Sequence, residues 1–289
     1  MNHGDRIEQT LEAAVARSAV PGCPPRLASA LRHAVFPGGA RIRPRLCLAV
    51  SDACAADHPS LAEGAAAAIE LLHCASLVHD DLPCFDDAMF RRGKPSVHRA
   101  YGQALAVLAG DGLIVLAFQT LAAAGAAVPG RLADLVVTIS GSVGLPAGIV
   151  AGQAWECEPE TDLCEYQQQK TGSLFAAASV AGAQAAGVES ASWRMLGEKL
   201  GEAYQVADDI LDVASDQETR GKPVGKDLAL GRPSAALHLG IPGAVRRLKL
   251  LVGEAIDSIP PCPGKAELTA LIMHEAQKLL PEEISRRAA

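Results

Sequence analysis

Ala- and Leu-rich stretches of helix length follow one another along this chain, separated by short runs of Gly and Pro. The clearest helices are predicted over residues 61–79 and 192–214. In the second stretch, apolar positions recur at the spacing of one helix face: Leu196, Leu200, Ala203, Ala207, Ile210 and Leu211. Strands do not alternate with helices, and no low-complexity linker or short repeat interrupts the pattern. We therefore predict one all-helical domain over residues 1–289.

The composition favours closely packed helices and excludes some partners. Apolar residues make up 49% of the sequence and aromatic residues only 3%, so the core must be built mainly from Ala, Leu and Val. The 26 basic and 33 acidic residues give a net charge of −7, which offers no overall attraction to nucleic acid or anionic lipid. Any phosphate binding must therefore be local.

Several features indicate a reduced, cytoplasmic protein without a membrane span. The eight cysteines include no CxxC pair and stand mostly in apolar runs. The first ten residues, MNHGDRIEQT, lack the apolar stretch of a signal peptide. The most apolar segments, 112–128 and 174–188, barely reach the length of a membrane span and are rich in Ala and Gly. Buried helices explain these segments better.

Carboxylates gather near the end of the first strong helix. The run is His79-Asp80-Asp81-Leu82-Pro83-Cys84-Phe85-Asp86-Asp87. Pro83 disfavours helix at the residue before it, so the helix should close at Asp80 and Asp81, with Asp86 on the loop beyond. A continuing helix would point Asp80 and Asp86 apart, whereas a loop can bring them together. Acidic groups at a helix C-terminus oppose the helix dipole, and a divalent cation would compensate them.

A second carboxylate cluster stands near the end of the other strong helix. Asp208 and Asp212 are four residues apart and share a helix face, so they repel each other unless a cation lies between them. All-oxygen ligands suit Mg²⁺, with Mn²⁺ as a possible substitute. Either cluster alone could be a solvated helix end. Two clusters, each followed by Lys and Arg, indicate a site that binds metal and phosphate together.

With these clusters, the chain resembles the trans-prenyl diphosphate synthase family along nearly its whole length. The stretch GGARIRP at residues 38–44 resembles the family's GGKRxRP, and residues 80–92 resemble its first aspartate motif with the bacterial two-residue insertion. Lys170-Thr171, residues 208–212 and Gly221-Lys222 follow in the family's order. The resemblance implies an all-α homodimer whose antiparallel helices surround a deep cavity, with the aspartate motifs facing each other across its mouth.

The resemblance also implies a role for each motif residue. Mg²⁺ on an allylic diphosphate would be held by Asp80, Asp81, Asp86, Asp208 and Asp212. The same diphosphate would be bound by Arg91, Lys170, Lys222 and Arg232. Isopentenyl diphosphate would be bound by Gly39, Arg43, His73 and Arg92. The allylic carbon–oxygen bond would break, the isopentenyl double bond would attack the cation, and the released diphosphate would take the proton. Thr171 and Gln205 would stabilise the cation with oxygen dipoles.

Three positions depart from the family's pattern. Ala40 stands where a Lys usually contacts isopentenyl diphosphate, so one charged contact is missing. Glu156 follows Gly152-Gln153 where Asp is usual, and Tyr204 replaces the usual Phe before Gln205. The first departure puts the affinity for isopentenyl diphosphate in question, and the other two are conservative in chemistry.

Product length should depend on the side chains one and two turns before Asp80, which would face down the cavity. These are Ala75 and Leu72, with Ser76 beside them. Family members that stop at fifteen carbons often carry an aromatic residue at the position of Ala75. The small side chain therefore favours geranylgeranyl diphosphate, with farnesyl diphosphate as the alternative product.

Three other hypotheses come from different protein classes. His73 and the pair His79-Asp80 loosely match the H…HD…D pattern of helical metal-dependent phosphohydrolases, but that function leaves the second cluster unexplained. A terpene cyclase normally has an Asn/Ser/Glu type of second metal motif, unlike residues 208–212. A non-catalytic partner subunit, suggested by Ala40, would be expected to lose an aspartate cluster, and both clusters are intact.

Overall fold

The described chain is almost entirely helical, as the sequence predicts. A computed structural model describes residues 2–36, 38–159, 168–214 and 234–279. In chain order its elements are α1 (His3–Ala16), α2 (Pro25–Val35), α3 (Ile42–Ala53), α4 (Pro59–Asp80), β1 (Phe90–Arg91), β2 (Lys94–Pro95), α5 (Val97–Tyr101), α6 (Gln103–Gly125), α7 (Pro129–Val143), α8 (Ile149–Ala154), η1 (Trp155–Cys157), η2 (Gln168–Gly172), α10 (Ser173–Ala186), η3 (Ala191–Trp193), α11 (Arg194–Ala214), α14 (Ala235–Asp257) and α15 (Lys265–Lys278). The helices predicted over 61–79 and 192–214 correspond to α4 and α11. In the described ranges, strands occur only as the short antiparallel hairpin β1–β2, in which Phe90 pairs with Pro95.

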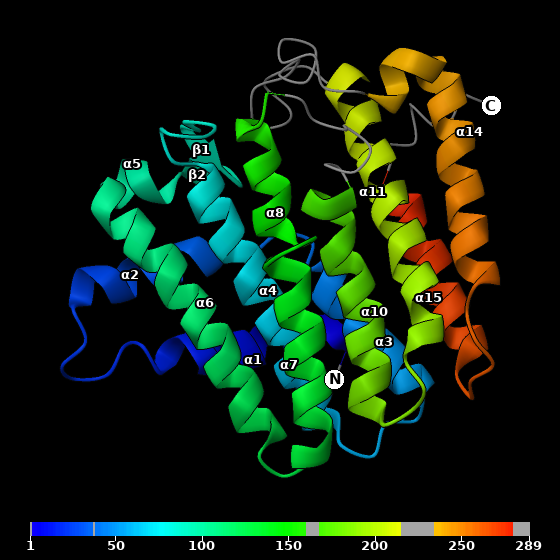
Figure 1. The fold of residues 1–289 in the computed structure, drawn as a ribbon, viewed down its shortest axis with the longest axis horizontal. Helices are drawn as coiled ribbons and strands as arrows, with labels where there is room; N and C mark the ends of the chain where they lie inside the picture. The colour runs from blue at the N-terminus through cyan, green and yellow to red at the C-terminus, as the bar shows by residue number, and fades with distance from the viewer. Residues whose placement is uncertain (1, 37, 160–167, 215–233, 280–289) are drawn as a thin grey trace.

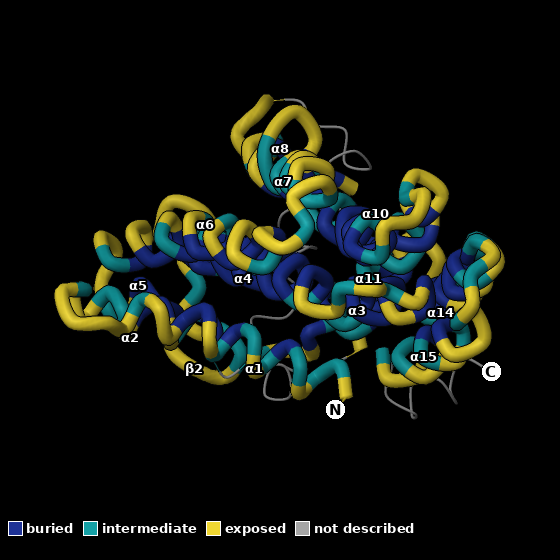
Figure 2. Tube along the Cα trace, turned by 90° about the horizontal axis from the view of Figure 1, so that it is seen from below, coloured by how far each residue is buried: buried dark blue, intermediate teal, exposed yellow. Residues whose placement is uncertain are grey.

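Helix α10 lies in the interior of the bundle and contacts α3, α4, α7 and α11 (Figure 1). The tube view in Figure 2 shows these inner helices buried and the outer faces of the bundle exposed. Glycines let the inner helices approach closely. A Cβ added at Gly182 would lie 2.4 Å from the Cys47 carbonyl oxygen, and one added at Gly197 would lie 2.3 Å from the Phe175 carbonyl oxygen. The predicted core of small, closely packed residues is therefore confirmed.

The two longest apolar helices differ in how far they are buried. Both α4 and α6 are long and apolar enough to span a membrane by length and composition. In α4 the apolar window is 78% buried inside the protein, as in the core helix of a folded domain, whereas in α6 only 44% is buried. Helix α6 therefore presents apolar side chains at the surface.

The ends of α4 and α11 bring both carboxylate clusters to one end of the bundle. Both helices end toward the top of Figure 1. Helix α4 ends where Pro83 predicts: the last helical residue is Asp80, Asp81 is the C-cap, and its N–H donates to the Leu77 carbonyl at 3.1 Å. The functional residues therefore lie at one end of the bundle.

Candidate active site

The first aspartate motif folds back on the end of α4. The N–H of Asp86 donates to the Asp80 carbonyl at 2.9 Å, and the N–H of Ala88 donates to the Asp81 carbonyl at 3.2 Å. These bonds return the loop to the helix end, so Asp86 comes back beside Asp80 as expected. Burial alone would lower the pKa of Arg91, but the hydrogen bonds that Arg91 donates to Asp81 and the negative charges of Asp81, Asp80 and Asp86 outweigh it and raise the pKa of this guanidinium.

Asp81 is paired with an arginine in this structure. Its carboxylate is only 2% exposed and accepts from Arg91 Nε at 3.0 Å and from Arg91 Nη2 at 2.5 Å. Burial raises the pKa of Asp81 despite this ion pair. Arg91 Nη2 also lies 4.0 Å from Asp80 Oδ2. The arrangement gives Asp81 the task of holding Arg91 beside Asp80, and leaves Asp80 and Asp86 better placed to bind a metal.

Lys170 reaches the first aspartate motif from a single π-helical turn. Its Nζ donates to Asp80 Oδ1 at 3.3 Å and to Glu156 Oε1 at 2.7 Å. Such π turns often occur at functional sites. Helix α8 touches this turn closely, since a Cβ added at Gly152 would lie 2.7 Å from the Lys170 backbone nitrogen. Glu156 also accepts from Gln153 Nε2 at 3.1 Å, so the Glu that replaces the usual Asp still holds the lysine.

The same turn connects the first cluster to the second. Thr171 Oγ1 donates to Gln205 Oε1 of α11 at 3.3 Å. Gln205 lies one turn before Asp208 and two turns before Asp212, whose half-buried side chains share its side of the helix. Both aspartate motifs therefore adjoin η2, as the expected arrangement requires. Lys222 and Arg232, also predicted to bind the diphosphate, lie outside the described residues.

The residues predicted for isopentenyl diphosphate form a second, strongly basic site. Arg43 Nη1 lies 3.4 Å from His73 Nε2, and the Arg43 guanidinium stacks 4.5 Å from the centre of the Phe175 ring. A Cβ added at Gly39 would lie 3.1 Å from Arg92 Nε. Burial and the neighbouring Arg43 and Arg92 charges hold the pKa of His73 well below its ordinary value. Gly39, Arg43, His73 and Arg92 are thus brought together, with a neutral histidine.

Two donors at this site lack an acceptor among the described residues. Arg43 Nε and Arg92 Nη1 are both buried and have no hydrogen-bond partner there. A buried donor left unpaired costs about 1–3 kcal/mol, and a donor on a charged guanidinium costs more. A bound diphosphate would supply the missing acceptors and counter-charge. The site therefore fits an anionic substrate.

A cavity of about 490 Å³ extends from the first aspartate motif into the bundle. Asp80, Lys170 and Thr171 line its polar part. Its apolar part includes the three residues predicted to set product length, namely Leu72, Ala75 and Ser76. No aromatic ring stands at these positions of α4. The cavity therefore offers polar groups at one end and space for a hydrocarbon chain at the other.

Comparisons with known proteins agree with this geometry. A family model described as polyprenyl synthetase matches residues 24–257. The geranylgeranyl diphosphate synthase of Cereibacter sphaeroides is 52% identical over 282 residues, which are 98% of each chain, and that of Rhodobacter capsulatus is 49% identical over 97% of each. This chain belongs to the polyprenyl synthetase family. A solved geranyltransferase from Helicobacter pylori, complexed with magnesium and isoprenyl diphosphate, is similar with a TM-score of 0.79, 29% identity and coverage of 94% of this chain and 96% of that one.

Within the described residues, no three His, Cys, Asp or Glu side chains are close enough to hold an ion by themselves. Mg²⁺ keeps several waters and binds through few carboxylates together with phosphate oxygens. Carboxylates beside Lys170 and Arg91 suit such shared binding.

His73 and His79 do not form a phosphohydrolase site. His73 faces Arg43, whereas His79 faces α6, where a Cβ added at Gly110 would lie 2.0 Å from its Nε2. His79 Nε2 also contacts the Val107 carbonyl at 3.3 Å. Because they contact different helices, the match to the H…HD…D pattern is a coincidence of sequence.

Glu70 is a buried carboxylate beside the basic site that sequence reasoning missed. Its carboxylate is 2% exposed, binds Arg41 Nη1 at 2.6 Å and lies 3.7 Å from Arg92 Nη2. Arg41 is itself buried, has a left-handed backbone with φ of 51° and also binds Glu8. Arg41 is thus a structural residue of the GGARIRP motif at residues 38–44. A lone Glu within the apolar run AAAAIELL was the available signal.

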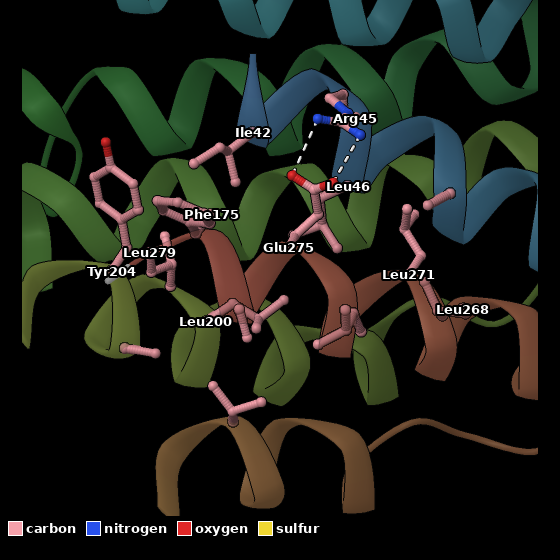
Figure 3. Close-up of a pocket in the computed structure, with 15 residues that line it drawn as sticks. Ile42, Arg45, Leu46, Phe175, Leu200, Tyr204, Leu268, Leu271, Glu275 and Leu279 are labelled. Carbon is pink, nitrogen blue, oxygen red and sulfur yellow. Dashed lines mark hydrogen bonds and ion pairs between the residues drawn. The ribbon is translucent and has the colours of Figure 1, made fainter. Parts of the chain in front are cut away.

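A separate apolar pocket lies behind the basic site, between α3, α10, α11, α14 and α15 (Figure 3). Phe175 and Tyr204 contribute to its wall, and Phe175 is the ring on which Arg43 stacks. Arg45 of α3 and Glu275 of α15 pair across it at 2.9 and 3.0 Å. This ion pair attaches the last described helix to the rest of the synthetase.

Proposed function

We propose that this chain is a geranylgeranyl diphosphate synthase. It would join isopentenyl diphosphate head-to-tail to allylic diphosphates until the chain has twenty carbons. One observation carries the choice of product: the cavity that begins at Asp80 continues past Ala75, where no ring closes it. The relatives from Cereibacter and Rhodobacter, about half identical over nearly the whole chain, carry the same name.

The allylic diphosphate would lie between the two aspartate motifs. Mg²⁺ bound by Asp80, Asp86, Asp208 and Asp212 would neutralise charge on the leaving diphosphate. Lys170, held between Asp80 and Glu156, adds a positive charge on the same side. The allylic carbon–oxygen bond then breaks, and its electron pair leaves with the diphosphate.

The basic site would hold isopentenyl diphosphate for the second half of the reaction. Arg43 and Arg92 each offer its diphosphate a donor that has no acceptor among the described residues, and neutral His73 offers a ring nitrogen. The isopentenyl double bond attacks the allylic cation, forming the new carbon–carbon bond. The adjacent C–H then gives its proton to the released diphosphate, and its electrons become the new double bond. Holding both substrates in place replaces a bimolecular encounter and supplies much of the rate.

Product analysis tests this function. Purified protein would receive Mg²⁺, isopentenyl diphosphate and a five-, ten- or fifteen-carbon allylic diphosphate, and the products would be separated by chain length. We expect a twenty-carbon product from each starter. A fifteen-carbon stop would keep the reaction but refute the proposed product. No condensation with any starter, or release of phosphate without condensation, would refute the synthase itself.

We also propose that the active enzyme is a homodimer that uses the apolar outer face of α6. Val107, Leu108 and Val115 lie on this face and are 42%, 51% and 57% exposed. A second copy would bury these side chains from both partners. Light scattering of the wild type should give twice the chain mass, and Leu108→Glu with Val115→Glu should give one chain mass. A monomeric wild type at assay concentrations would refute this proposal.

A further inference from the structure

Asp209 stands next to the predicted metal ligand Asp208, but its side chain faces into the protein. It is 3% exposed. Its Oδ1 accepts from Gln205 Nε2 at 2.9 Å, and its Oδ2 accepts from the backbone N–H of Ala235 at 2.8 Å. Ala235 is the first residue of α14, whose N-cap Ser234 makes no side-chain capping bond. One buried carboxylate therefore contacts both Gln205, the hydrogen-bond partner of the cavity residue Thr171, and the start of another helix.

The contact with Asp209 fixes the direction of the Gln205 amide. An ionised carboxylate only accepts hydrogen bonds, so Gln205 must turn its NH₂ group toward Asp209. Its Oε1 then faces Thr171, whose hydroxyl donates to it at 3.3 Å. The hydroxyl proton of Thr171 is therefore donated to Gln205 and does not point into the cavity. Thr171 lines this cavity beside Asp80 and Lys170. The Thr171 hydroxyl thus donates toward Gln205, and Gln205 donates toward Asp209, so the lone pairs of the Thr171 oxygen remain for the cavity.

We propose that Asp209 is a positioning residue for ionisation of the allylic substrate. It orients Gln205, and through it Thr171, so that oxygens and not N–H or O–H groups face the developing cation. This inference rests on the proposed function and adds to it. Preorganised dipoles of one sign stabilise charge in a transition state without reorganisation, and removing one commonly lowers the rate by roughly a hundredfold or more.

The substitution Asp209→Asn separates positioning from structure. The Asn carbonyl can accept the fixed N–H of Ala235, which preserves the contact with α14. Its NH₂ group then faces Gln205, so the Gln205 amide must rotate and present its own NH₂ to Thr171. The substitution keeps the shape of the site but reverses the direction of the hydrogen bonds among residues 209, 205 and 171. Glu202→Gln is the matched control, because Glu202 also joins α11 to α14, through Arg247, without touching Gln205.

The experiment is a double-mutant cycle read by single-turnover kinetics, which isolates the chemical step. D209N should lower the single-turnover rate roughly tenfold to a hundredfold, with the substrate KM, product length and melting temperature close to wild type. In a Gln205→Met background, D209N should have no further effect. E202Q should match the wild-type rate. An equal D209N effect in both backgrounds, or no effect in either, would overturn the proposal.

A binding measurement gives a second readout that a structural role would not change. An allylic diphosphate analogue with an ammonium centre in place of the cationic carbon is compared with an uncharged thiolodiphosphate analogue of equal length. Wild type should prefer the charged analogue, and D209N should lose that preference by about tenfold or more. Equal preference in both proteins would overturn the proposal.

The proposal stays testable if D209N does not fold, and its failure can be told apart from failure of the proposed function. If D209N does not fold, Thr171→Val and Thr171→Ser replace it: the Ser variant should keep the preference for the charged analogue and the Val variant should lose it, and equal preference would overturn the proposal. A wild type that makes no condensation product would refute the proposed function. An active wild type with an unaffected D209N would refute only the positioning role.

Discussion

Replacing Ala75 by Phe should shorten the product by at least one isoprene unit. Ala75 is 2% exposed and lines the cavity of about 490 Å³ below Asp80. A ring of benzene size fills roughly 150 Å³, so the new side chain would take about a third of the space. One misfit methylene costs roughly 1–3 kcal/mol. A five-carbon unit that no longer fits should cost more than about 5 kcal/mol, a factor above ~10³ in the ratio of twenty- to fifteen-carbon product.

The assay supplies isopentenyl diphosphate with the ten-carbon starter and measures product lengths by chromatography after dephosphorylation. Ala75→Ser is the control, since it adds one atom and should leave the twenty-carbon product. Overpacking by Phe would cost about 1–3 kcal/mol if the ring pressed into the core and not the cavity, so urea unfolding is measured alongside. A stable Phe variant that still makes the twenty-carbon product would refute this account of chain length.

Three further predictions address the metal, the histidine and the buried glutamate. Asp80→Ala and Asp208→Ala should each lower condensation by more than ~10³-fold with unchanged circular dichroism; near-normal turnover would exclude a metal clamp. Because burial holds the pKa of His73 below its unfolded value of about 6.5, the unfolded chain binds this proton first. Stability from His73 is therefore present above pH 6.5 and lost as the pH falls below it. The His73→Asn variant should show a smaller change in the free energy of unfolding, measured with urea, between pH 7 and 5. Glu70→Gln should cost roughly 3–5 kcal/mol in urea unfolding and raise the KM for isopentenyl diphosphate through Arg92, and an unchanged KM would contradict the role given to Glu70.

Local signals in the sequence predicted the helices and the ends of those that carry the site. The apolar spacing of α11 and the position of Pro83 are properties of short segments, and the structure confirms both. The cavity followed from the family resemblance, because no short segment encodes a space between helices. The prediction that Ala75 and Leu72 line it depended on helical spacing counted back from Asp80, and the structure places both there.

Contacts between distant residues could not be predicted in this way. The pairing of Asp81 with Arg91 requires the β1–β2 hairpin, which returns the chain only after ten residues. The π-helical turn of Lys170 has no sequence signal that we recognise. Glu70 was overlooked because its partners Arg41 and Arg92 lie on other elements. The Asp81–Arg91 and Glu70 contacts are tertiary ion pairs, whose energy local propensity does not contain.

The close contact at Gly152 has a consequence for how this enzyme tolerates genetic variation. The position of Lys170 depends on residue 152 being a glycine, because even a methyl group there would press on the Lys170 backbone. In a library of random variants, Gly152 should therefore behave like a catalytic residue, with every replacement selected against. An evolving lineage could change the product cavity at Ala75 far more freely than it could add a single carbon atom at Gly152.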